Sequence, residues 1–336
     1  MIVVKWLFLI LPVFTTATAS AETTPSPSPE KPIIQHLDGK QALAKMAVAM
    51  QTLNYQGTVA FLRDSKLEPM KYFHAASQGR EQEHLLSLNS PLREMIRDRN
   101  TGKVSCLYTA TGQLVVDHRP FEHSFLLEMP ANLAQLDSVY DIQLTGEENI
   151  ALLPTYVVSI KPKDTLRYAR KVWLSKQWFL PLKVAVYDQT DKVLQELVFT
   201  ELEVKDHLPF VEMAETIAKP PVQPQAHTGT VAFALSALPQ GFKEVFFRRE
   251  PMHNAEKLVD HILLSDGLAS VSVYIEPKTD AAPFGGLSTP NVQTIDAVNF
   301  FTHAMGDYQL TVIGEVPSET IRLIAAAITL PKPAAK

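Results

Sequence analysis

The stretch His261-Ile-Leu-Leu-Ser-Asp-Gly-Leu-Ala-Ser-Val-Ser-Val-Tyr-Ile-Glu-Pro277 reads as a turn followed by a strand. Its Ser265-Asp-Gly267 segment is typical of a tight turn, because Asp bonds to nearby backbone and Gly adopts positive φ. From Val271 to Ile275 apolar and polar residues alternate, as on a strand with one buried face. With residues 257–264 as its partner, this stretch predicts an antiparallel hairpin.

The same alternation runs through the first half of the chain, over about 150 residues after Leu53. Turn residues, such as those at 100–102 and 188–191, separate the short runs by hairpin-length connections. Such a series predicts an antiparallel meander rather than βαβ units. The predicted strands are residues 56–63, 70–76, 82–88, 94–99, 103–108, 113–117, 139–144, 155–161, 169–174, 181–187 and 193–204.

Two apolar segments are candidates for helices inside this sheet. Asp38 and Gln41 have the spacing of a capping box before residues 39–53, where apolar residues recur at helical intervals. Residues 121–136 are apolar enough for a short helix. A meander of this length has to close or curl to bury an apolar face. We therefore predict a mainly β fold with α-helices (α+β), in which a large antiparallel curved sheet, or half-barrel, wraps around helices.

The side chains that face the inside of this sheet have two interpretations. If the helices fill the concavity only in part, a pocket for an acyl chain remains; if they fill it, the same residues are core. Periodicity alone does not separate the two. The lipid-binding candidates are Met46, Met50, Phe61, Tyr72, Phe125 and Met129.

The first residues predict export. Lys5 precedes an apolar run from Trp6 to Phe14 and an Ala-Ser-Ala site ending at Ala21, the pattern of a secretory signal peptide over residues 1–21. The run is too short to span a bilayer, and no Cys follows the site to carry a lipid. Prolines at 25, 27 and 29 then predict a disordered tether over residues 22–36.

Prolines also divide the mature chain. The run Lys219-Pro-Pro-Val-Gln-Pro-Gln225 predicts a linker over residues 219–229, either a hinge or a fixed spacer. It separates a curved β domain at residues 37–218 from a small α+β domain at residues 230–330. In the small domain we predict strands at 243–249, 257–264, 268–276, 297–304 and 308–315, and a last helix that Pro317 opens.

Composition and motifs exclude several classes of function. With 36 acidic and 31 basic residues the net charge is −5, which gives no strong field for nucleic acid. The single cysteine, Cys106, excludes an intramolecular disulfide, and we interpret it as a strand residue. The sequence has no nucleophile elbow, His-Glu-x-x-His, phosphate loop or Cys-x-x-Cys, and its 10 histidines show no helical i, i+4 spacing. We therefore predict no enzyme, no catalytic residue, no metal and no cofactor.

One candidate binding surface is basic. Residues 161–176 contain many more basic than acidic side chains. Arg167 and Arg170 could form charge-assisted hydrogen bonds with lipid phosphates. The alternative is a solvated strand face that protects the edge of a sheet.

A second candidate surface is a protein interface. It combines Phe246, Arg248 and Arg249 with the turn residues Ser265 and Asp266. Aromatic residues and Arg carry much of the energy of interfaces from which water is excluded. The alternative is a Phe in the core beside exposed arginines, as strand alternation would produce.

A series of short motifs, in order along the chain, is similar to those of one family. They are Asn54-Tyr-Gln-Gly57, Arg167-Tyr168, Lys171-Val-Trp-Leu174, Leu180-Pro-Leu182, Leu238-Pro-Gln-Gly-Phe242, Ser265-Asp-Gly-Leu-Ala-Ser270 and Gly314-Glu-Val-Pro317. With the signal peptide and the linker, they make nearly the whole mature chain resemble the RseB/MucB family, periplasmic negative regulators of the envelope-stress sigma factor sigma-E. Residues 149–154 depart from the Gly/Arg-containing turn that is commoner there.

This resemblance implies a fold, a location and partners. The large domain would be similar to the lipoprotein carriers LolA and LolB. The small domain would help to hold the periplasmic domain of a membrane-spanning anti-sigma factor and shield it from the site-1 protease. Lipid or lipopolysaccharide ligands would loosen this grip in the periplasm. A periplasmic lipid or lipoprotein carrier without a signalling role is the alternative, and a homo-oligomer is left open.

Overall fold

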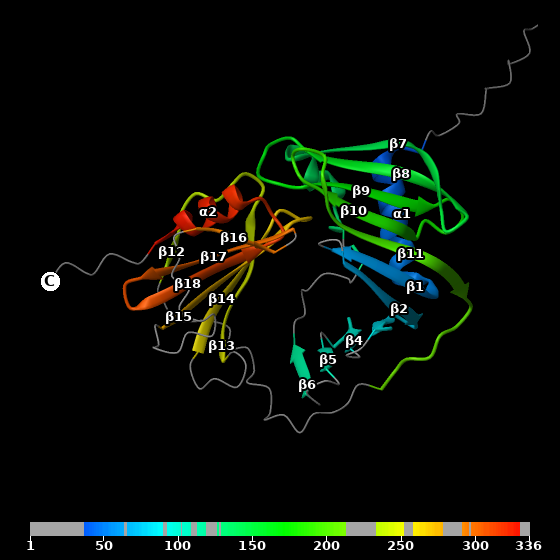
Figure 1. The fold of residues 1–336 in the computed structure, drawn as a ribbon, viewed down its shortest axis with the longest axis horizontal. Coiled ribbons are helices and arrows are strands. Elements are labelled where there is room, and N and C mark those ends of the chain that lie inside the picture. The colour runs from blue at the N-terminus through cyan, green and yellow to red at the C-terminus, as the bar shows by residue number, and fades with distance from the viewer. Residues whose placement is uncertain are drawn as a thin grey trace, which may run out of the picture. The chain divides into compact units, whose positions relative to one another are not determined.

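The computed structural model describes residues 37–329, apart from 64–65, 90–92, 102, 109–112, 119–125, 128, 213–232, 252–257, 278–290 and 296. The predicted signal peptide, tether and Pro-rich linker lie outside the described residues, as does Phe125. The described part of the chain forms mostly strands, with two α-helices and one 3-10 helix (Figure 1). The predicted mainly β fold is confirmed.

The larger sheet has 11 strands, all paired antiparallel. The strands are β1 (Asn54–Arg63), β2 (Lys66–Ser77), β3 (Arg80–Ser87), β4 (Arg93–Asp98), β5 (Lys103–Tyr108), β6 (Gln113–His118), β7 (Tyr140–Ile150), β8 (Leu153–Pro162), β9 (Ala169–Ser175), β10 (Pro181–Tyr187) and β11 (Val193–Lys205). Their order is β6-β5-β4-β3-β2-β1-β11-β10-β9-β8-β7. Two meanders of hairpins therefore meet in the middle of the sheet, where β1 pairs with β11.

Residues at the start of β1 explain its central place. At Gly57 an added Cβ would lie 2.1 Å from the carbonyl oxygen of Glu201, so a larger residue would keep β11 away. The side chain of Asn54 accepts a hydrogen bond from the Ala76 amide (2.9 Å) and donates one to the Ala76 carbonyl (3.1 Å), as a neighbouring strand would. The Asn-Tyr-Gln-Gly motif thus fixes the pairing of β1 on both sides.

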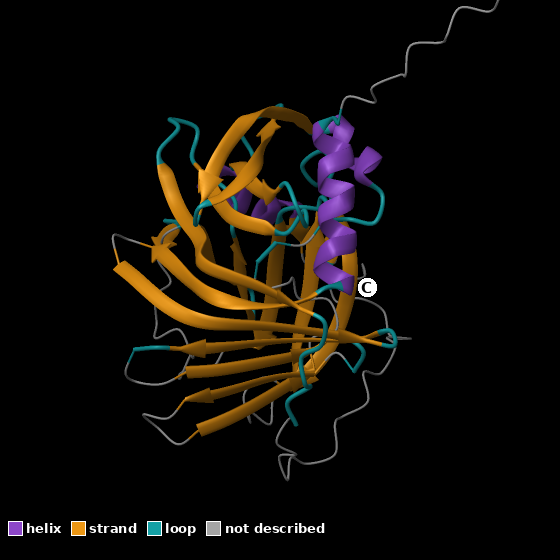
Figure 2. Ribbon diagram, turned by 90° about the vertical axis from the view of Figure 1, so that its right-hand side faces the viewer, coloured by secondary structure: helices purple, strands orange, loops and turns teal. Residues whose placement is uncertain are grey.

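Helix α1 (Gly39–Thr52) lies on the inner side of this curved sheet (Figure 2). The predicted capping box is present: the Gln41 amide donates to Asp38 Oδ1 (2.8 Å), and the Asp38 amide donates to Gln41 Oε1 (3.1 Å). One face of the helix, including Leu43 and Met46, is fully buried in the apolar core of the sheet. Burial of each such side chain is worth about 1.5–3 kcal/mol.

The prediction of a second helix inside the sheet, at residues 121–136, is wrong for the described residues of that segment. A 3-10 helix, η1 (Leu133–Ser138), is the only helical element there, and it starts where the Asn132 side chain accepts a hydrogen bond from the Ala134 amide. Pro130 precedes it, and proline does not allow an α-helix to continue from the preceding turn. Leu136 is nevertheless buried in the core of the large sheet, so the apolar pattern indicated burial correctly.

The smaller sheet has six strands in the order β13-β14-β15-β18-β17-β16. They are β13 (Lys243–Pro251), β14 (Leu258–Ser265), β15 (Ser270–Pro277), β16 (Gln293–Ile295), β17 (Val298–Met305) and β18 (Tyr308–Gly314), with α2 (Ser318–Ala327) on one face and a two-stranded pair of β12 (Ala234–Leu235) with β19 (Ile328–Thr329). Helix α2 begins after Pro317, as predicted. The sequence did not indicate β12, β16 or β19, which are too short for an alternating pattern.

The hairpin of β14 and β15 forms as predicted. Ser265 lies opposite Ser270 across the turn, and Gly267 has a φ of 100°. Burial alternates along β15, with Val271 and Val273 fully buried against α2. The turn that joins β14 to β15 is part of the candidate functional site.

Candidate functional site

The inside of the large sheet holds an apolar core in the described residues. Met46, Met50 and Tyr72 are buried in it, and Phe61 and Met129 are partly buried against it. The structure thus brings the described lipid-binding candidates of this region together on one side of the sheet. Their role in lipid binding stays a prediction.

Polar side chains line the same inner side of β2, β3 and β4. The Tyr72 hydroxyl donates to Glu83 Oε1 (2.8 Å), and Arg97 Nη1 lies 3.4 Å from Glu83 Oε2. Burial raises the pKa of Tyr72 well above its usual value, and the Glu83 carboxylate raises it further. The hydroxyl therefore stays protonated and acts as a donor.

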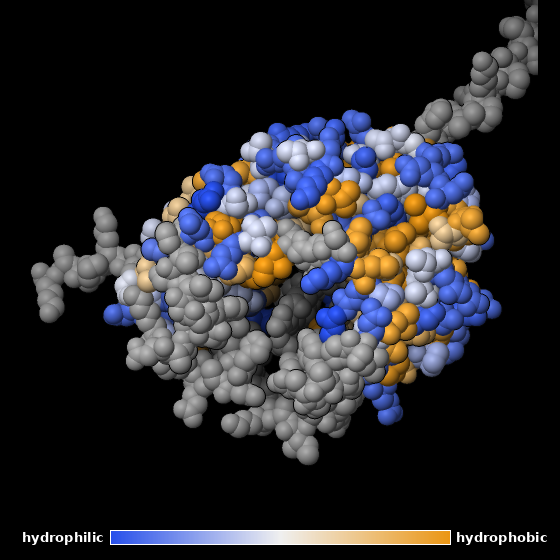
Figure 3. Space-filling view, in the orientation of Figure 1, coloured by the Kyte–Doolittle hydropathy of each residue, from blue (hydrophilic) through white to orange (hydrophobic). Residues whose placement is uncertain are grey.

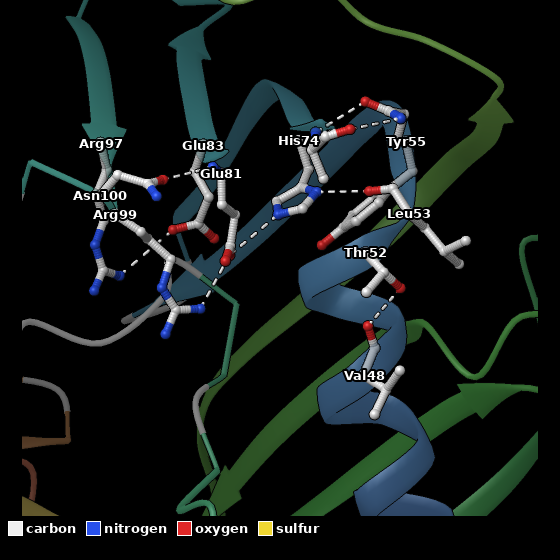
Figure 4. Close-up of polar contacts among 12 residues, drawn as sticks. Val48, Thr52, Leu53, Tyr55, His74, Glu81, Glu83, Arg97, Arg99 and Asn100 are labelled. Carbon is white, nitrogen blue, oxygen red and sulfur yellow. Dashed lines mark hydrogen bonds and ion pairs between the residues drawn. The ribbon is translucent and has the colours of Figure 1, made fainter. Parts of the chain in front are cut away.

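His74, also on β2, connects Glu81 of β3 to the end of α1. Its Nδ1 lies 2.8 Å from the carbonyl oxygen of Leu53, and its Nε2 lies 3.3 Å from Glu81 Oε1. Arg99 donates to the same Glu81 oxygen at 3.0 Å. Figure 4 shows these side chains reaching from β2, β3 and the end of β4 toward one another beside the last turn of α1. The group holds the helix end against the sheet.

A second group of residues, with the buried side chains of Arg167, Arg170 and Asp266 at its centre, lies where the two sheets contact each other, and we call it the junction. Its members are Tyr140, Asp164, Arg167 and Arg170 from the large-sheet part, and Gln240, Asp266, Leu268 and Glu315 from the small-sheet part. Charged groups are rarely buried unless they are paired and hydrogen-bonded. The junction meets this condition through contacts across the two sheets.

Arg167 is the centre of the junction and is 0% exposed. Its Nε donates to Asp266 Oδ2 at 2.5 Å, Nη1 donates to Asp164, and Nη2 donates to the carbonyl oxygen of Gln240. Burial lowers the pKa of the guanidinium, but its hydrogen bond and ion pair with Asp266 raise it more, so the net pKa is raised. The side chain therefore stays charged in the interior.

Asp266 is held in position by its own turn. Its Oδ1 accepts hydrogen bonds from the amides of Leu268 (2.9 Å) and Ala269 (2.8 Å). Its Oδ2, which faces Arg167, also accepts one from the Tyr140 hydroxyl at 2.9 Å. Both carboxylate oxygens are thus engaged, and the turn presents one charge to the large sheet.

Leu268 belongs to the apolar core of the large sheet, although it comes from the turn between β14 and β15. Arg170 fixes this residue from the other side: its Nη1 donates to the Leu268 carbonyl (2.9 Å), and its Nη2 donates to Glu315 Oε1 (3.0 Å). The turn therefore inserts both a carboxylate and an apolar side chain into the large-sheet part.

Several sequence motifs meet at the junction. Tyr168, next to Arg167, accepts a hydrogen bond from Asn299 Nδ2 at 2.9 Å. An added Cβ at Gly241, in the Leu-Pro-Gln-Gly-Phe motif, would lie 3.0 Å from the Val139 side chain. The φ of Gly241 is 87°, which favours glycine. Motifs separated along the chain thus build one contact.

For Arg167 and Arg170, the structure corrects the interpretation of residues 161–176 as a solvated strand face. Arg167 and Arg170 are buried, with 0% and 7% of their surface exposed, and both pair with the small-sheet part. Their acidic partners in the small-sheet part, Asp266 and Glu315, lie 99 and 145 residues further along the chain, so local sequence carried no signal for these pairs. Direct binding of a phosphate by these two arginines stays a prediction and would require the junction to open.

The candidate partner-binding residues lie on β13 and at the end of its neighbouring strand β14. Ser265 and Asp266 are in the junction turn, whereas Phe246, Arg248 and Arg249 are on β13. Arg249 forms two hydrogen bonds with Asp260, and the Arg248 guanidinium lies 4.6 Å from the ring centre of Phe246. Their role in partner binding stays a prediction.

The outer face of the large sheet has an apolar cluster of its own. Val157, Trp173 and Ala185 are buried there. Lys183 covers the Trp173 ring at 4.8 Å, and the Trp173 indole donates to Glu148 at 2.9 Å. Figure 3 shows apolar residues gathered over β9, β10 and β11 on this face.

In the described part of the chain, no helix is long and apolar enough to cross a membrane.

Fold and junction define a class of protein in which a large curved sheet around a helix is joined through buried ion pairs to a small α+β sheet. The family models agree with this division. A model of the MucB/RseB N-terminal domain matches residues 38–221, and one of the MucB/RseB C-terminal domain matches residues 227–329. The chain belongs to the MucB/RseB family, which confirms the resemblance of its motifs.

Characterised relatives and solved structures are similar over most of the chain. The sigma factor AlgU regulatory protein MucB of Pseudomonas aeruginosa is 28% identical over 308 residues, 88% of this chain and 92% of the relative. The sigma-E factor regulatory protein RseB of Escherichia coli K12 is 26% identical over 298 residues, 85% of this chain and 89% of the relative. MucB in the Pseudomonas aeruginosa MucA/MucB complex is 25% identical, with a TM-score of 0.66 over 88% of this chain and 99% of that one.

Proposed function

We propose that this protein is a periplasmic negative regulator of a sigma-E type envelope-stress response, and that it binds the periplasmic domain of a membrane-spanning anti-sigma factor. The main support is the similarity, along both domains, to MucB solved in complex with MucA. The relatives are named as regulatory proteins of sigma factors rather than as enzymes. Regulation through binding alone is consistent with the interior, where charged groups are paired with one another.

The finer mechanism is that the bound anti-sigma domain is shielded from the site-1 protease until a lipid weakens binding. Two features of the structure support a ligand-sensitive arrangement. The large sheet surrounds an apolar interior, and its contact with the small sheet depends on ion pairs that another anion could replace. A lipid acts on such an equilibrium only through a difference in affinity for the two arrangements.

Proteolysis of the anti-sigma domain tests this function. The mature protein is mixed with the periplasmic fragment of the anti-sigma factor from the same organism, and cleavage by the site-1 protease is followed over time. We expect slower cleavage with the protein, and faster cleavage again when lipopolysaccharide is added. Serum albumin at the same concentration is the control for unspecific protection.

The outcomes separate the alternatives. If the fragment neither binds nor is protected, while the protein binds lipid, the chain is a lipid or lipoprotein carrier and the regulatory role is wrong. If protection occurs and lipopolysaccharide leaves it unchanged, the regulator remains and lipid release is wrong. Sedimentation of the protein alone tests whether it forms a homo-oligomer.

A further inference from the structure

We propose that the junction turn, residues 265–269, occupies a lipid site of the large sheet and mimics an anionic lipid. The turn inserts Leu268 into the apolar core while the carboxylate of Asp266 contacts Arg167. An acidic group beside an apolar group is the chemistry of a phosphate-headed lipid. Such a lipid would bind Arg167 and Arg170 with its phosphate, place an acyl chain where Leu268 lies, and displace the turn. This inference rests on the proposed lipid sensitivity.

The donors of Arg167 favour a phosphate over a carboxylate. Its Nε, Nη1 and Nη2 donate to oxygens of three different residues, Asp266, Asp164 and Gln240. Opening of the junction frees Nε and Nη2 of Arg167 together with Nη1 and Nη2 of Arg170, while Asp164 keeps Nη1 of Arg167. A phosphate monoester offers three charged oxygens to this donor set, whereas a carboxylate offers two. Arg is the residue best suited to phosphate recognition because its donors are planar and always charged.

Charge also favours an anion once the junction opens. The small-sheet part contributes the carboxylates of Asp266 and Glu315, which pair with Arg167 and Arg170. When these carboxylates leave, the two guanidinium groups remain on the large sheet with Asp164 as their local acid. Two cations against one carboxylate leave a positive site.

The apolar half of the site distinguishes a lipid from free phosphate or an acidic peptide. Leu268 is 5% exposed and packs in the same cluster as the α1 residues Leu43 and Met46. A headgroup alone would replace Asp266 and leave the space of Leu268 unfilled, which costs the burial of that side chain. A phosphate with an acyl chain replaces both, so it opens the junction at lower concentration.

Two substitutions that weaken the competing turn form the main test. Asp266→Asn keeps the oxygen that accepts from the Leu268 and Ala269 amides but removes the charge opposite Arg167. Leu268→Ala removes the apolar side chain. Because each removes a competitor of the lipid, we expect each to bind lipopolysaccharide about three- to tenfold more tightly than wild type. Arg170→Gln removes a headgroup donor and should bind it about tenfold more weakly.

Asp260→Asn is the matched control, because Asp260 pairs with Arg249 inside the small sheet, away from the junction turn. Its lipopolysaccharide affinity should equal that of wild type. The probes are lipopolysaccharide, enzymatically dephosphorylated lipopolysaccharide, inorganic pyrophosphate and an acidic peptide. Only the intact lipid should speed amide hydrogen exchange at residues 265–269 of the wild-type protein at micromolar concentration.

That exchange measurement needs no variant and keeps the test valid if a substitution prevents folding. Unchanged exchange at 265–269 with bound lipopolysaccharide, or equal affinities of Asp266→Asn, Leu268→Ala and wild type, would overturn the inference. Opening by pyrophosphate alone would reduce the site to a phosphate site, and opening by the peptide would make it a protein site; both results contradict the lipid mimic. Protection of the anti-sigma fragment without lipid tests the proposed function separately.

Discussion

The interior of the large sheet and the junction are both buried, but different forces hold them. In the interior, Leu43 and Met46 on α1 pack against apolar strand residues. Exposure of these side chains to water would be unfavourable, so the contact stays closed. At the junction, Arg167 and Arg170 are held by carboxylates and carbonyls that water or another anion can replace. The difference indicates that the interior is a fixed scaffold and that the junction is the part suited to switching.

The largest expected effect comes from leaving one junction charge without its partner. Arg167→Leu leaves Asp266 buried and unpaired, which should cost about 3–5 kcal/mol. Urea unfolding measures this loss, and hydrogen exchange at 265–269 locates it. Arg322→Leu is the control, because the side chains of Arg322 and of its partner Glu319 are 54% and 58% exposed. Equal losses for the two variants would contradict a special role of the junction.

A cavity in the interior should destabilise the scaffold without opening the junction. Met46→Ala removes a fully buried side chain and should cost about 2–5 kcal/mol of the free energy of unfolding. Val48→Ala on the same helix, 61% exposed, should stay within about 0.5 kcal/mol. Faster amide hydrogen exchange confined to residues 265–269 in Met46→Ala would show that the interior and the junction are coupled, and would contradict their separation.

The central strand pair gives a third, smaller test of the scaffold. Gly57→Ala places a Cβ against the Glu201 carbonyl and should cost about 1–3 kcal/mol. Gly146→Ala on β7 meets no atom within 4 Å and should leave the melting temperature unchanged. Thermal unfolding of both variants decides the point, and similar melting temperatures would mean that β11 moves away at no cost.

The smallest effect concerns a charge pair at the edge of the scaffold. Burial raises the pKa of Asp98, but hydrogen bonds from the Thr101 amide and Arg80 lower it more, so the pKa is below its ordinary value. Such a carboxyl stabilises the fold above its unfolded pKa, and this contribution is lost as the pH falls through the folded pKa.

Asp98→Asn should therefore flatten the fall in stability below about pH 4. The difference should be under about 1 kcal/mol, because the Arg80 side chain is 48% exposed and screened by water. Melting temperatures between pH 3 and 6 measure it, with Asp206→Asn as the control. If Asp266→Asn changed the pH dependence of the melting temperature as little as Asp98→Asn does, the proposed difference between the junction and the scaffold would be weakened.

Local pattern predicted most of the strands, because alternation is a property of neighbouring residues. Residues 103–108 and 181–187 form strands with the predicted bounds. The pairing of β1 with β11 joins Asn54 to Lys205, and no local signal reports such a contact. The 3-10 helix at η1 differs from the predicted helix because Pro130 acts against the apolar pattern.

The candidate site was predictable only in parts. The sequence singled out Arg167, Arg170, Ser265 and Asp266, but assigned the arginines and the turn to separate surfaces. Their burial depends on the packing of one sheet against the other, since Arg167 and Asp266 are 99 residues apart. Turn chemistry indicated the shape of residues 265–267 but not what the turn contacts.

The placement of β1 beside β11 also governs when the protein can fold. Because Asn54 pairs with Lys205, the middle of the large sheet forms only after both segments have left the ribosome. Until then each meander exposes an unpaired strand edge and an uncovered apolar face. The growing polypeptide should therefore stay open for much of its synthesis, a state in which it can still be threaded through a narrow channel.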